Sequence, residues 1–341
     1  MNPHWKIGSV VLTIGLCSLV ASPSRADMVL TNAGQTAGFQ LTTFATGFSH
    51  TGTTTTGIGP LGIAFAPSGV VLVSTEPGDL YRLPNHQDGQ SVTSANIVSH
   101  VSATNLQGLS TLGERVFVSS DGGGSLFEIH SSNNFSTVNY TKFGPTLSIA
   151  RDLRTNFATG NLFVVTGDGI IAVNPSSGAS RLVTPQGGGD GMTIDASGKI
   201  VYLTDYAGGH VLGFNIQTGT PVFDSGFISN NPIHIDGIAL GTGSLARELF
   251  VNDNGGRLWE VDLDTKVQTL IGTGGSRGDY VAVDPTDGTL FITQSDSILH
   301  LTAPGGGGFG GSVPEPSSFI LLGLGLIGGF RILARRRRIA S

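Results

Sequence analysis

Cysteine is nearly absent from this 341-residue sequence, in which Cys17 is the single one. One cysteine cannot form a disulfide framework or a four-cysteine zinc site within the chain. Charged residues are also scarce, at 12% of the sequence, whereas 39% of the residues are apolar. This balance excludes a disordered chain and predicts one or two domains with an apolar core.

Basic residues are far fewer than acidic residues in the middle of the chain. Of the 18 lysines and arginines, seven lie in residues 1–26 or 313–341, but only one of the 24 acidic residues does, which leaves a net charge of −12 between these segments. Binding to nucleic acid or anionic lipid depends on lysine and arginine that neutralise phosphate groups. The middle region is therefore predicted to bind no nucleic acid, and its charge favours cations or neutral glycans as ligands.

The first 26 residues have the layout of a secretory signal peptide. Lys6 precedes an apolar run over residues 7–20, and Ser24-Arg25-Ala26 is a small-x-small cleavage signal. The sequence predicts cleavage between Ala26 and Asp27, so that the mature chain contains no cysteine. A plain membrane anchor is the alternative, but the apolar run is shorter than the ~20 residues that a span needs.

The last 29 residues combine a motif, a short apolar segment and a basic end. The motif is Val313-Pro314-Glu315-Pro316, the apolar segment covers residues 319–330, and the basic end is Arg335, Arg336, Arg337 and Arg338. Under the positive-inside rule the arginines stay in the cytoplasm, so the preceding chain lies outside. The segment is predicted to form a short transmembrane helix, and its length and glycines favour a transient anchor.

This layout resembles the PEP-CTERM sorting signal of Gram-negative bacteria. The resemblance implies recognition by an exosortase-like enzyme and transfer to the outer surface or the extracellular matrix, with transient anchoring in the inner membrane. An ordinary C-terminal anchor with chance prolines is the alternative.

Six copies of one unit fill the middle of the chain. They begin near residues 61, 107, 151, 190, 236 and 279, and each holds apolar runs of three to five residues that are separated by turns rich in Gly or Asp. Six units of about 43 residues with four strands each predict an all-β fold, a six-bladed β-propeller over residues 27–304. Its closing strand is expected at about 39–45, and residues 305–312 are expected to form a glycine-rich linker.

The fourth unit carries the clearest family resemblance. Its stretch 190–205, DGMTIDASGKIVYLTD, resembles the repeats of NHL proteins and of the gluconolactonase or senescence-marker-protein-like group. That resemblance implies a divalent metal held at the central channel, where Asp190 and Asp236 match the metal-binding aspartate best. The first unit begins with Gly59-Pro60-Leu61, which departs from the glutamate that the family places there, and no asparagine stands at the other entering turns.

Acidic residues cluster at the turns that a propeller places on one face. The turns that enter the first strands hold the candidate metal ligands Asp152, Asp190, Asp236 and Asp279. The turns between second and third strands hold Glu76, Asp79, Asp121, Asp168, Asp205, Asp253 and Asp296. Converging carboxylates suit calcium or another divalent cation, which is the one candidate cofactor. The alternative is turn chemistry, because Asp before Gly bonds its own backbone.

Two functions follow from these features. The first is a monomeric surface or matrix propeller, a binding or scaffold module for exopolysaccharide or surface proteins. The second is a metal-dependent lactonase-like hydrolase with its site at the central channel. No catalytic residue is assigned, and a purely structural matrix role is a third alternative.

Overall fold

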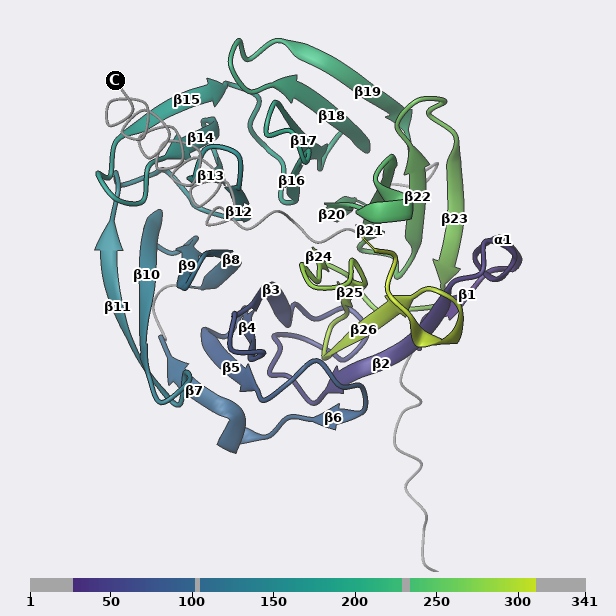
Figure 1. Ribbon diagram of the computed structural model, residues 1–341, viewed down its shortest axis with the longest axis horizontal. Helices are drawn as coiled ribbons and strands as arrows, with labels where there is room; N and C mark the ends of the chain where they lie inside the picture. Colours follow the sequence, from purple (N-terminus) through teal and green to yellow (C-terminus); the bar gives the residue numbers. More distant parts are fainter. Residues whose placement is uncertain (1–26, 102–104, 229–233, 311–341) are drawn as a thin grey trace, which may run out of the picture.

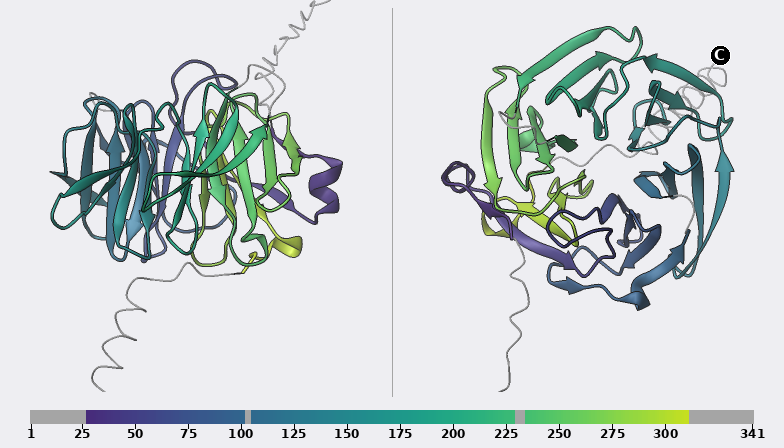
Figure 2. Two further views of the ribbon diagram at one scale, coloured as in Figure 1. Left: turned by 90° about the horizontal axis from the view of Figure 1, so that it is seen from above. Right: turned by 180° about the vertical axis from the view of Figure 1, so that it is seen from behind.

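Six antiparallel sheets surround a central axis in the computed structural model, which describes residues 27–101, 105–228 and 234–310 (Figure 1). The innermost strand of each sheet lies next to the axis, and Figure 2 shows the flat disc that results. The predicted all-β, six-bladed propeller is thus confirmed.

Each blade contains consecutive strands that run from the axis to the rim. Blade 1 consists of β3 (Pro60–Phe65), β4 (Val71–Thr75), β5 (Asp79–Leu83) and β7 (Ile97–His100). Blade 2 consists of β8 (Leu106–Leu112), β9 (Arg115–Ser120), β10 (Ser125–Ser132) and β11 (Thr137–Phe143). Blade 3 consists of β12 (Leu153–Asn156), β13 (Asn161–Thr166), β14 (Gly169–Val173) and β15 (Ser180–Thr184).

The second half of the ring repeats this plan. Blade 4 consists of β16 (Met192–Ile194), β17 (Ile200–Asp205), β18 (His210–Asn215) and β19 (Pro221–Phe227). Blade 5 consists of β20 (Ile235–Leu240), β21 (Glu248–Asp253), β22 (Leu258–Asp262) and β23 (Gln268–Thr273). Blade 6 begins with β24 (Val281–Val283), β25 (Leu290–Thr293) and β26 (Ser297–Thr302).

The N-terminal part of the chain completes blade 6. Its strand β2 (Gln40–Thr46) pairs antiparallel with β26, at the place where the sequence predicts a closing strand. The short strand β1 (Val29–Leu30) pairs with the rim strand of blade 5, and β6 (Gln90–Ser91) runs parallel to β2. A short helix, α1 (Asn32–Thr36), lies between β1 and β2, and the 3₁₀ turns are η1 (Ser94–Asn96), η2 (Gly243–Leu245) and η3 (Pro304–Gly306). This closure covers the outer edge of β26, which would otherwise be a free strand edge.

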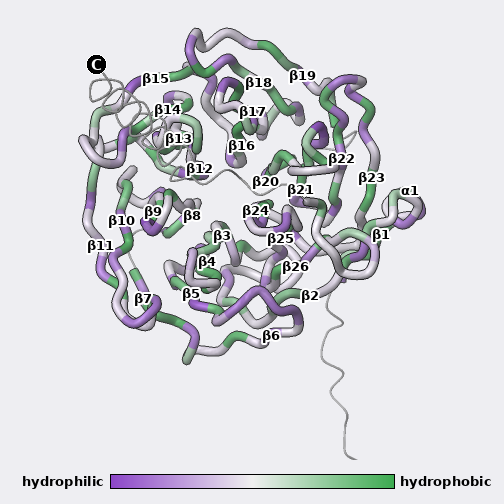
Figure 3. The backbone as a smooth tube through the Cα atoms, in the orientation of Figure 1, coloured by the Kyte–Doolittle hydropathy of each residue, from purple (hydrophilic) through white to green (hydrophobic). Residues whose placement is uncertain are grey.

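The core lies between neighbouring blades. The strands near the axis are buried along their whole length, for example β3 and β4, because both faces of each blade pack against a neighbouring blade. Figure 3 shows the apolar stretches of the chain in green. At the junction of blades 6 and 1, Phe291 packs against Phe44 and Phe65 with ring centroids 4.7 and 5.0 Å apart. Phe44 and Phe291 are fully buried, so this contact holds the two ends of the ring together.

Glycine at one position of the repeat allows the inner strands of neighbouring blades to approach one another closely around the axis. The second position of the repeat is Gly62, Gly108, Gly191 and Gly237 in four of the six blades. A Cβ atom at each of them would collide with the backbone of the next blade, for example with Tyr280 in the case of Gly237. Asp152 and Tyr280 hold this position in blades 3 and 6, so larger side chains reach the axis from only these two blades.

Residues 303–310 pack against the propeller, although the sequence predicts a linker from residue 305. The backbone N–H of Gly310 donates to Asp287, and the carbonyl of Phe309 accepts from Ser244. The Phe309 ring lies edge-on to Phe39 with centroids 5.8 Å apart. The last described residues are thus fixed at the turns where β20 and β24 end.

Both predicted terminal segments lie outside the described residues, apart from Asp27. This applies to the signal peptide with Ala26, to the motif Val313-Pro314-Glu315-Pro316 and to the arginines at 335–338. Within residues 27–101, 105–228 and 234–310, no helix is long and apolar enough to span a membrane.

A methyl group at Gly237 is expected to destabilise the ring. We expect Gly237→Ala to lower the free energy of unfolding by about 1–3 kcal/mol, because the blade 5–blade 6 contact must open to admit a Cβ. The measurement is chemical unfolding of the exported protein. Gly167→Ala is the control, since its Cβ would meet side chains rather than backbone, the nearest atom being the Ser148 hydroxyl at 3.1 Å. Equal effects of the two substitutions would contradict the role of close approach.

Candidate functional site

A cavity of 410 Å³ opens at the end of the channel where the inner strands begin. Residues at the start of all six inner strands line it, together with three from the adjacent turns between second and third strands, Glu76, Asp121 and Tyr206. We name this cavity the acidic mouth after its carboxylates: Glu76, Asp121, Asp152, Asp190, Asp236 and Asp279. The four candidate metal ligands predicted from the sequence therefore all border one cavity.

Three of these aspartates lie close together. Asp236 and Asp279 are buried, at 3% and 7% exposure, and their carboxyl groups lie within hydrogen-bonding reach of each other. Burial and then the neighbouring Asp279 and Asp190 raise the pKa of Asp236 well above its usual value. Burial likewise raises the pKa of Asp190 and of Asp279. Crowded carboxylates of this kind need a positive group beside them.

Two arginines supply that positive charge. Arg277 contacts Asp279 at 2.7 Å and lies 3.6 Å from Asp236, so its guanidinium group bridges the two carboxylates. Arg151 forms an ion pair with Asp190. The Arg277 side chain is 23% exposed, and its backbone N–H donates to Thr55 of the loop that precedes blade 1. Both arginines therefore sit inside the mouth rather than on the outer surface.

The donor set does not fit a divalent cation. Calcium takes six to eight oxygen ligands, and a carboxylate that is committed to a guanidinium group is a poor ligand. Asp236 and Asp279 are engaged by Arg277 and by each other, and Asp190 is paired separately with Arg151. Among the described residues, no group of three or more His, Cys, Asp and Glu side chains is placed to hold a metal ion.

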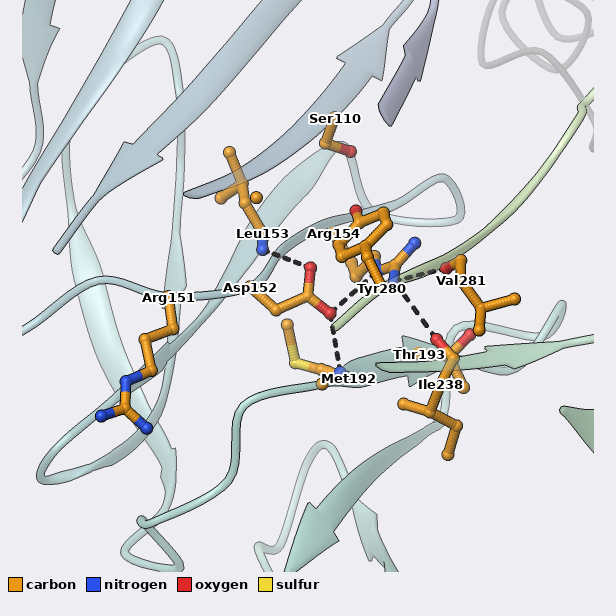
Figure 4. Close-up of polar contacts among 12 residues, drawn as sticks. Ser110, Arg151, Asp152, Leu153, Arg154, Met192, Thr193, Ile238, Tyr280 and Val281 are labelled. Atoms are coloured by element: carbon orange, nitrogen blue, oxygen red, sulfur yellow. Dashed lines mark hydrogen bonds and ion pairs between the residues drawn. The ribbon is translucent and has the colours of Figure 1, made fainter. Parts of the chain in front are cut away.

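Asp152 belongs to a different arrangement, which closes the channel (Figure 4). Its carboxylate accepts hydrogen bonds from the backbone N–H groups of Leu153 and Met192, both at 2.7 Å, and from Arg154 Nε at 3.1 Å. Burial raises the pKa of Asp152, and the neighbouring Arg154 opposes that shift. Asp152 is 3% exposed, so its oxygens are committed to the fold.

Arg154 connects three further blades. Its Nη2 donates to the carbonyl groups of Ile238 at 3.2 Å and Val281 at 2.9 Å, and its guanidinium carbon lies 4.2 Å from the centre of the Tyr280 ring. The Tyr280 hydroxyl donates to the carbonyl of Leu109 at 3.2 Å. We name Asp152, Arg154 and Tyr280 the channel plug, because Tyr280 lines the acidic mouth and Arg154 lines the cavity at the other end.

Two acids of the second set of turns accept hydrogen bonds from the backbone of their own turns. Asp205 accepts from the N–H of Gly208, and Asp253 accepts from those of Gly255 and Arg257. Asp79 bonds the Ser49 hydroxyl at 2.6 Å and the His100 ring at 2.7 Å. From this set only Glu76 and Asp121 line the mouth, and burial together with Asp121 and Asp279 raises the pKa of Glu76.

Sequence reasoning missed the basic and aromatic residues of the mouth. Arg151 directly precedes Asp152, and Arg277 stands two positions before Asp279, so both could have been found next to the repeat aspartates. Tyr206 also lines the mouth, and its ring stacks on His234 with centroids 4.0 Å apart and planes 9° apart. These residues give the mouth hydrogen-bond donors and a flat aromatic surface.

The residues before Asp279 have the spacing of a serine-hydrolase motif, Gly274-Gly275-Ser276-Arg277-Gly278. In α/β-hydrolases this motif joins a strand to a helix and exposes the serine. Here it joins β23 to β24, and Ser276 is buried, with its hydroxyl directed to Gln294 and the backbone of Ser295. The geometry does not present Ser276 as a nucleophile.

Comparison with known proteins identifies the C-terminal segment. Residues 312–338 match the PEP-CTERM protein-sorting motif. The match confirms the predicted sorting signal, and with it sorting to the cell envelope through an exosortase-type enzyme. A search of curated proteins finds no match.

Solved structures share the propeller fold. A gluconolactonase of Xanthomonas campestris is 14% identical, with 81% of this chain and 94% of that chain covered and a TM-score of 0.57. A luciferin-regenerating enzyme is 11% identical, with 81% and 99% covered and a TM-score of 0.58. A chain of the nidogen–laminin complex is 14% identical, with 71% and 97% covered and a TM-score of 0.54. At these identities the likeness shows the fold alone.

Loss of the Asp152 charge is expected to destabilise the propeller strongly. Asp152→Asn leaves the Arg154 guanidinium buried without its partner, and we expect the free energy of unfolding to fall by about 3–5 kcal/mol. The control is Asp264→Asn, which breaks the exposed Arg247–Asp264 pair and is expected to have a far smaller effect, because solvent screens that pair. Chemical unfolding measures both. A loss below about 1 kcal/mol for Asp152→Asn would show that the channel plug is not a stabilising element.

Removal of Arg277 is expected to create a calcium site. In Arg277→Gln, Asp236 and Asp279 lose their shared cation, so calcium at 100 times its Kd should stabilise the variant by about 2.7 kcal/mol relative to the calcium-free form. Thermal melts with calcium and with chelator measure the difference, and Arg82→Gln on β5 is the control. Saturable calcium binding by the unsubstituted protein, lost in Asp190→Ala and Asp236→Ala, would instead establish the metal site that the sequence predicts.

Proposed function

We propose that this chain is an exported, monomeric propeller that binds a neutral, hydroxyl-rich polymer, an exopolysaccharide, through its acidic mouth. Its sorting signal delivers it to the outer surface or the extracellular matrix after transient anchoring in the inner membrane. The observation that carries this proposal is the pairing of buried carboxylates with Arg151 and Arg277 in an open cavity.

Paired charges suit sugar hydroxyl groups. Each hydroxyl donates one hydrogen bond and accepts others, so carboxylate acceptors and guanidinium donors side by side satisfy both roles without a net charge on the ligand. The stacked rings of Tyr206 and His234 add a flat apolar surface on which a sugar ring can lie. The channel plug gives the cavity a closed floor, as small-molecule sites commonly have.

The position of the last described residues leaves the acidic mouth accessible. Phe309 and Gly310 contact Ser244 and Asp287 at the turns where the inner strands end, and the sorting motif begins at residue 312. The acidic mouth opens where the inner strands begin, on the opposite face of the disc. Attachment through the C-terminal segment therefore directs the acidic mouth away from the attachment point.

A lactonase-like hydrolase is the second candidate. Carboxyl groups with raised pKa in a cavity, here Glu76 and Asp236, are typical of acid–base sites. The fold is shared with a gluconolactonase. The pairing of Asp236 with Arg277 weighs against a metal-dependent form of this reaction, because the same carboxylate would have to serve as a ligand.

Calorimetric titration of the exported protein with exopolysaccharide of the producing cells tests the proposal. We expect saturable binding that weakens at least ten-fold, about 1.4 kcal/mol, in Tyr206→Ala and in Arg151→Gln. The matched control is Arg82→Gln, on the outer part of blade 1. No binding, or equal binding in all variants, would contradict a glycan site in the acidic mouth.

A lactone assay distinguishes the second candidate. Release of acid from gluconolactone or related lactones, abolished in Asp236→Asn and in Glu76→Gln, would replace the binding function by hydrolysis. Binding of a surface protein with no affinity for polysaccharide would change the ligand class and leave the mouth as the site.

A further inference from the structure

A second cavity, of 810 Å³, lies at the end of the channel where the inner strands end. All six blades contribute residues of their inner strands to its wall: Ile63, Leu109, Thr155, Ile194, Ala239 and Ala282. Its volume lies within the range of about 300–1,000 Å³ that is typical of small-molecule sites. We name it the apolar mouth, because aliphatic side chains form most of this wall.

The apolar mouth has one basic side chain at its inner end, Arg154. Arg247 and Asp195 also line the cavity, and each is already engaged, Arg247 by Asp264 and Asp195 by Ser197 and the backbone of its own turn. Arg154 lines the cavity, and its Nε and Nη2 are held by Asp152, Ile238 and Val281. Within the described ranges 27–101, 105–228 and 234–310, no side chain or carbonyl accepts a hydrogen bond from Nη1. In Figure 4 this nitrogen points away from Asp152 and carries no dashed line. Its two N–H donors therefore face the cavity.

We propose that the apolar mouth binds an amphiphile, a molecule with an aliphatic body and a carboxylate head. The aliphatic body packs against the apolar wall, and binding is favoured because apolar surface of both partners leaves water. The carboxylate accepts charge-assisted hydrogen bonds from Arg154 Nη1, which has no acceptor among the described residues. The backbone bonds of Nη2 and the Tyr280 ring fix the guanidinium group before the ligand arrives.

This site is separate from the acidic mouth. The channel plug lies between the two cavities, with Tyr280 facing one and Arg154 facing the other. The apolar mouth opens on the face that holds Phe309 and Gly310, next to the sorting segment, because Thr242 and Gly243 line its rim and contact Gly310. The proposal is thus independent of the ligand bound at the acidic mouth.

Calorimetric titration of the exported protein with decanoate below its micelle concentration tests the proposal. Decanol and decyltrimethylammonium are the uncharged and cationic comparisons. We expect one decanoate per chain, at least ten-fold weaker binding of decanol, and weaker binding still of the cation. Equal affinity for decanoate and decanol would overturn the role of Arg154, and absence of saturable binding would overturn the site.

Two rim variants locate the site without touching the channel plug. Ala196 and Ala246 are exposed and line the apolar mouth, so Ala196→Trp and Ala246→Trp should each weaken decanoate binding at least ten-fold by filling the opening. Ala33→Trp on the exposed helix α1 is the control. Unchanged binding in both rim variants would overturn the assignment.

Arg154→Lys tests whether Arg154 recognises the carboxylate head of the ligand, and a thermal melt checks that this variant folds. We expect decanoate affinity to fall while decanol affinity stays constant, because the shorter lysine side chain keeps its charge beside Asp152 but lacks the second donor group that Nη1 provides. Arg277→Gln, at the acidic mouth, should leave decanoate binding unchanged. Loss of decanoate binding in Arg277→Gln would show that the two cavities act as one and overturn the proposed separation.

Discussion

The buried ion pair between Asp152 and Arg154 is the interaction on which the channel depends. Through it blade 3 contacts Met192 of blade 4, Ile238 of blade 5 and Val281 of blade 6. Tyr280, which lies under the guanidinium group, extends the contact to Leu109 of blade 2. A buried charge is stable only when it is paired and its hydrogen bonds are satisfied, and the inward-facing backbone groups of four blades provide those bonds. The pair divides the channel into two cavities of opposite character.

Close approach of the inner strands makes this arrangement possible. Glycine at the second position of four blades removes the side chains that would otherwise meet on the axis. The space that remains is enough for the side chains of Asp152, Tyr280 and Arg154. On the side of the acidic mouth, the entering turns bring polar residues to the axis. On the side of the apolar mouth, most inner strands end with aliphatic residues. The two mouths differ in character because all six inner strands run in the same direction along the axis, so that their starts gather at one mouth and their ends at the other.

Charge pairing distinguishes the acidic mouth from a metal centre. Carboxylates that gather around a channel can be balanced by a divalent cation or by basic side chains, and here Arg151 and Arg277 fill that role. The solved propellers that resemble this chain include a gluconolactonase and a chain of the nidogen–laminin complex, so the fold alone does not assign a function. The sorting motif is the feature that assigns the chain to the cell envelope.

The sequence by itself determined the strands, the repeat and the sorting signal. Alternating apolar runs between glycine and aspartate turns recur six times, and the C-terminal motif is contiguous, so each can be identified within a short window. The placement of Asp152, Asp190, Asp236 and Asp279 around one cavity also followed from their common position in the repeat.

Only the tertiary structure decided the partner of each carboxylate. Asp190 meets Arg151 from another blade, and Asp152 turns to Met192, 40 residues away, rather than to the other aspartates. The apolar mouth had no sequence signal, because its wall takes single residues from six strands. Ring closure brings these distant residues together, and the choice between a bound cation and an arginine depends on distances of a few ångströms that no local pattern contains.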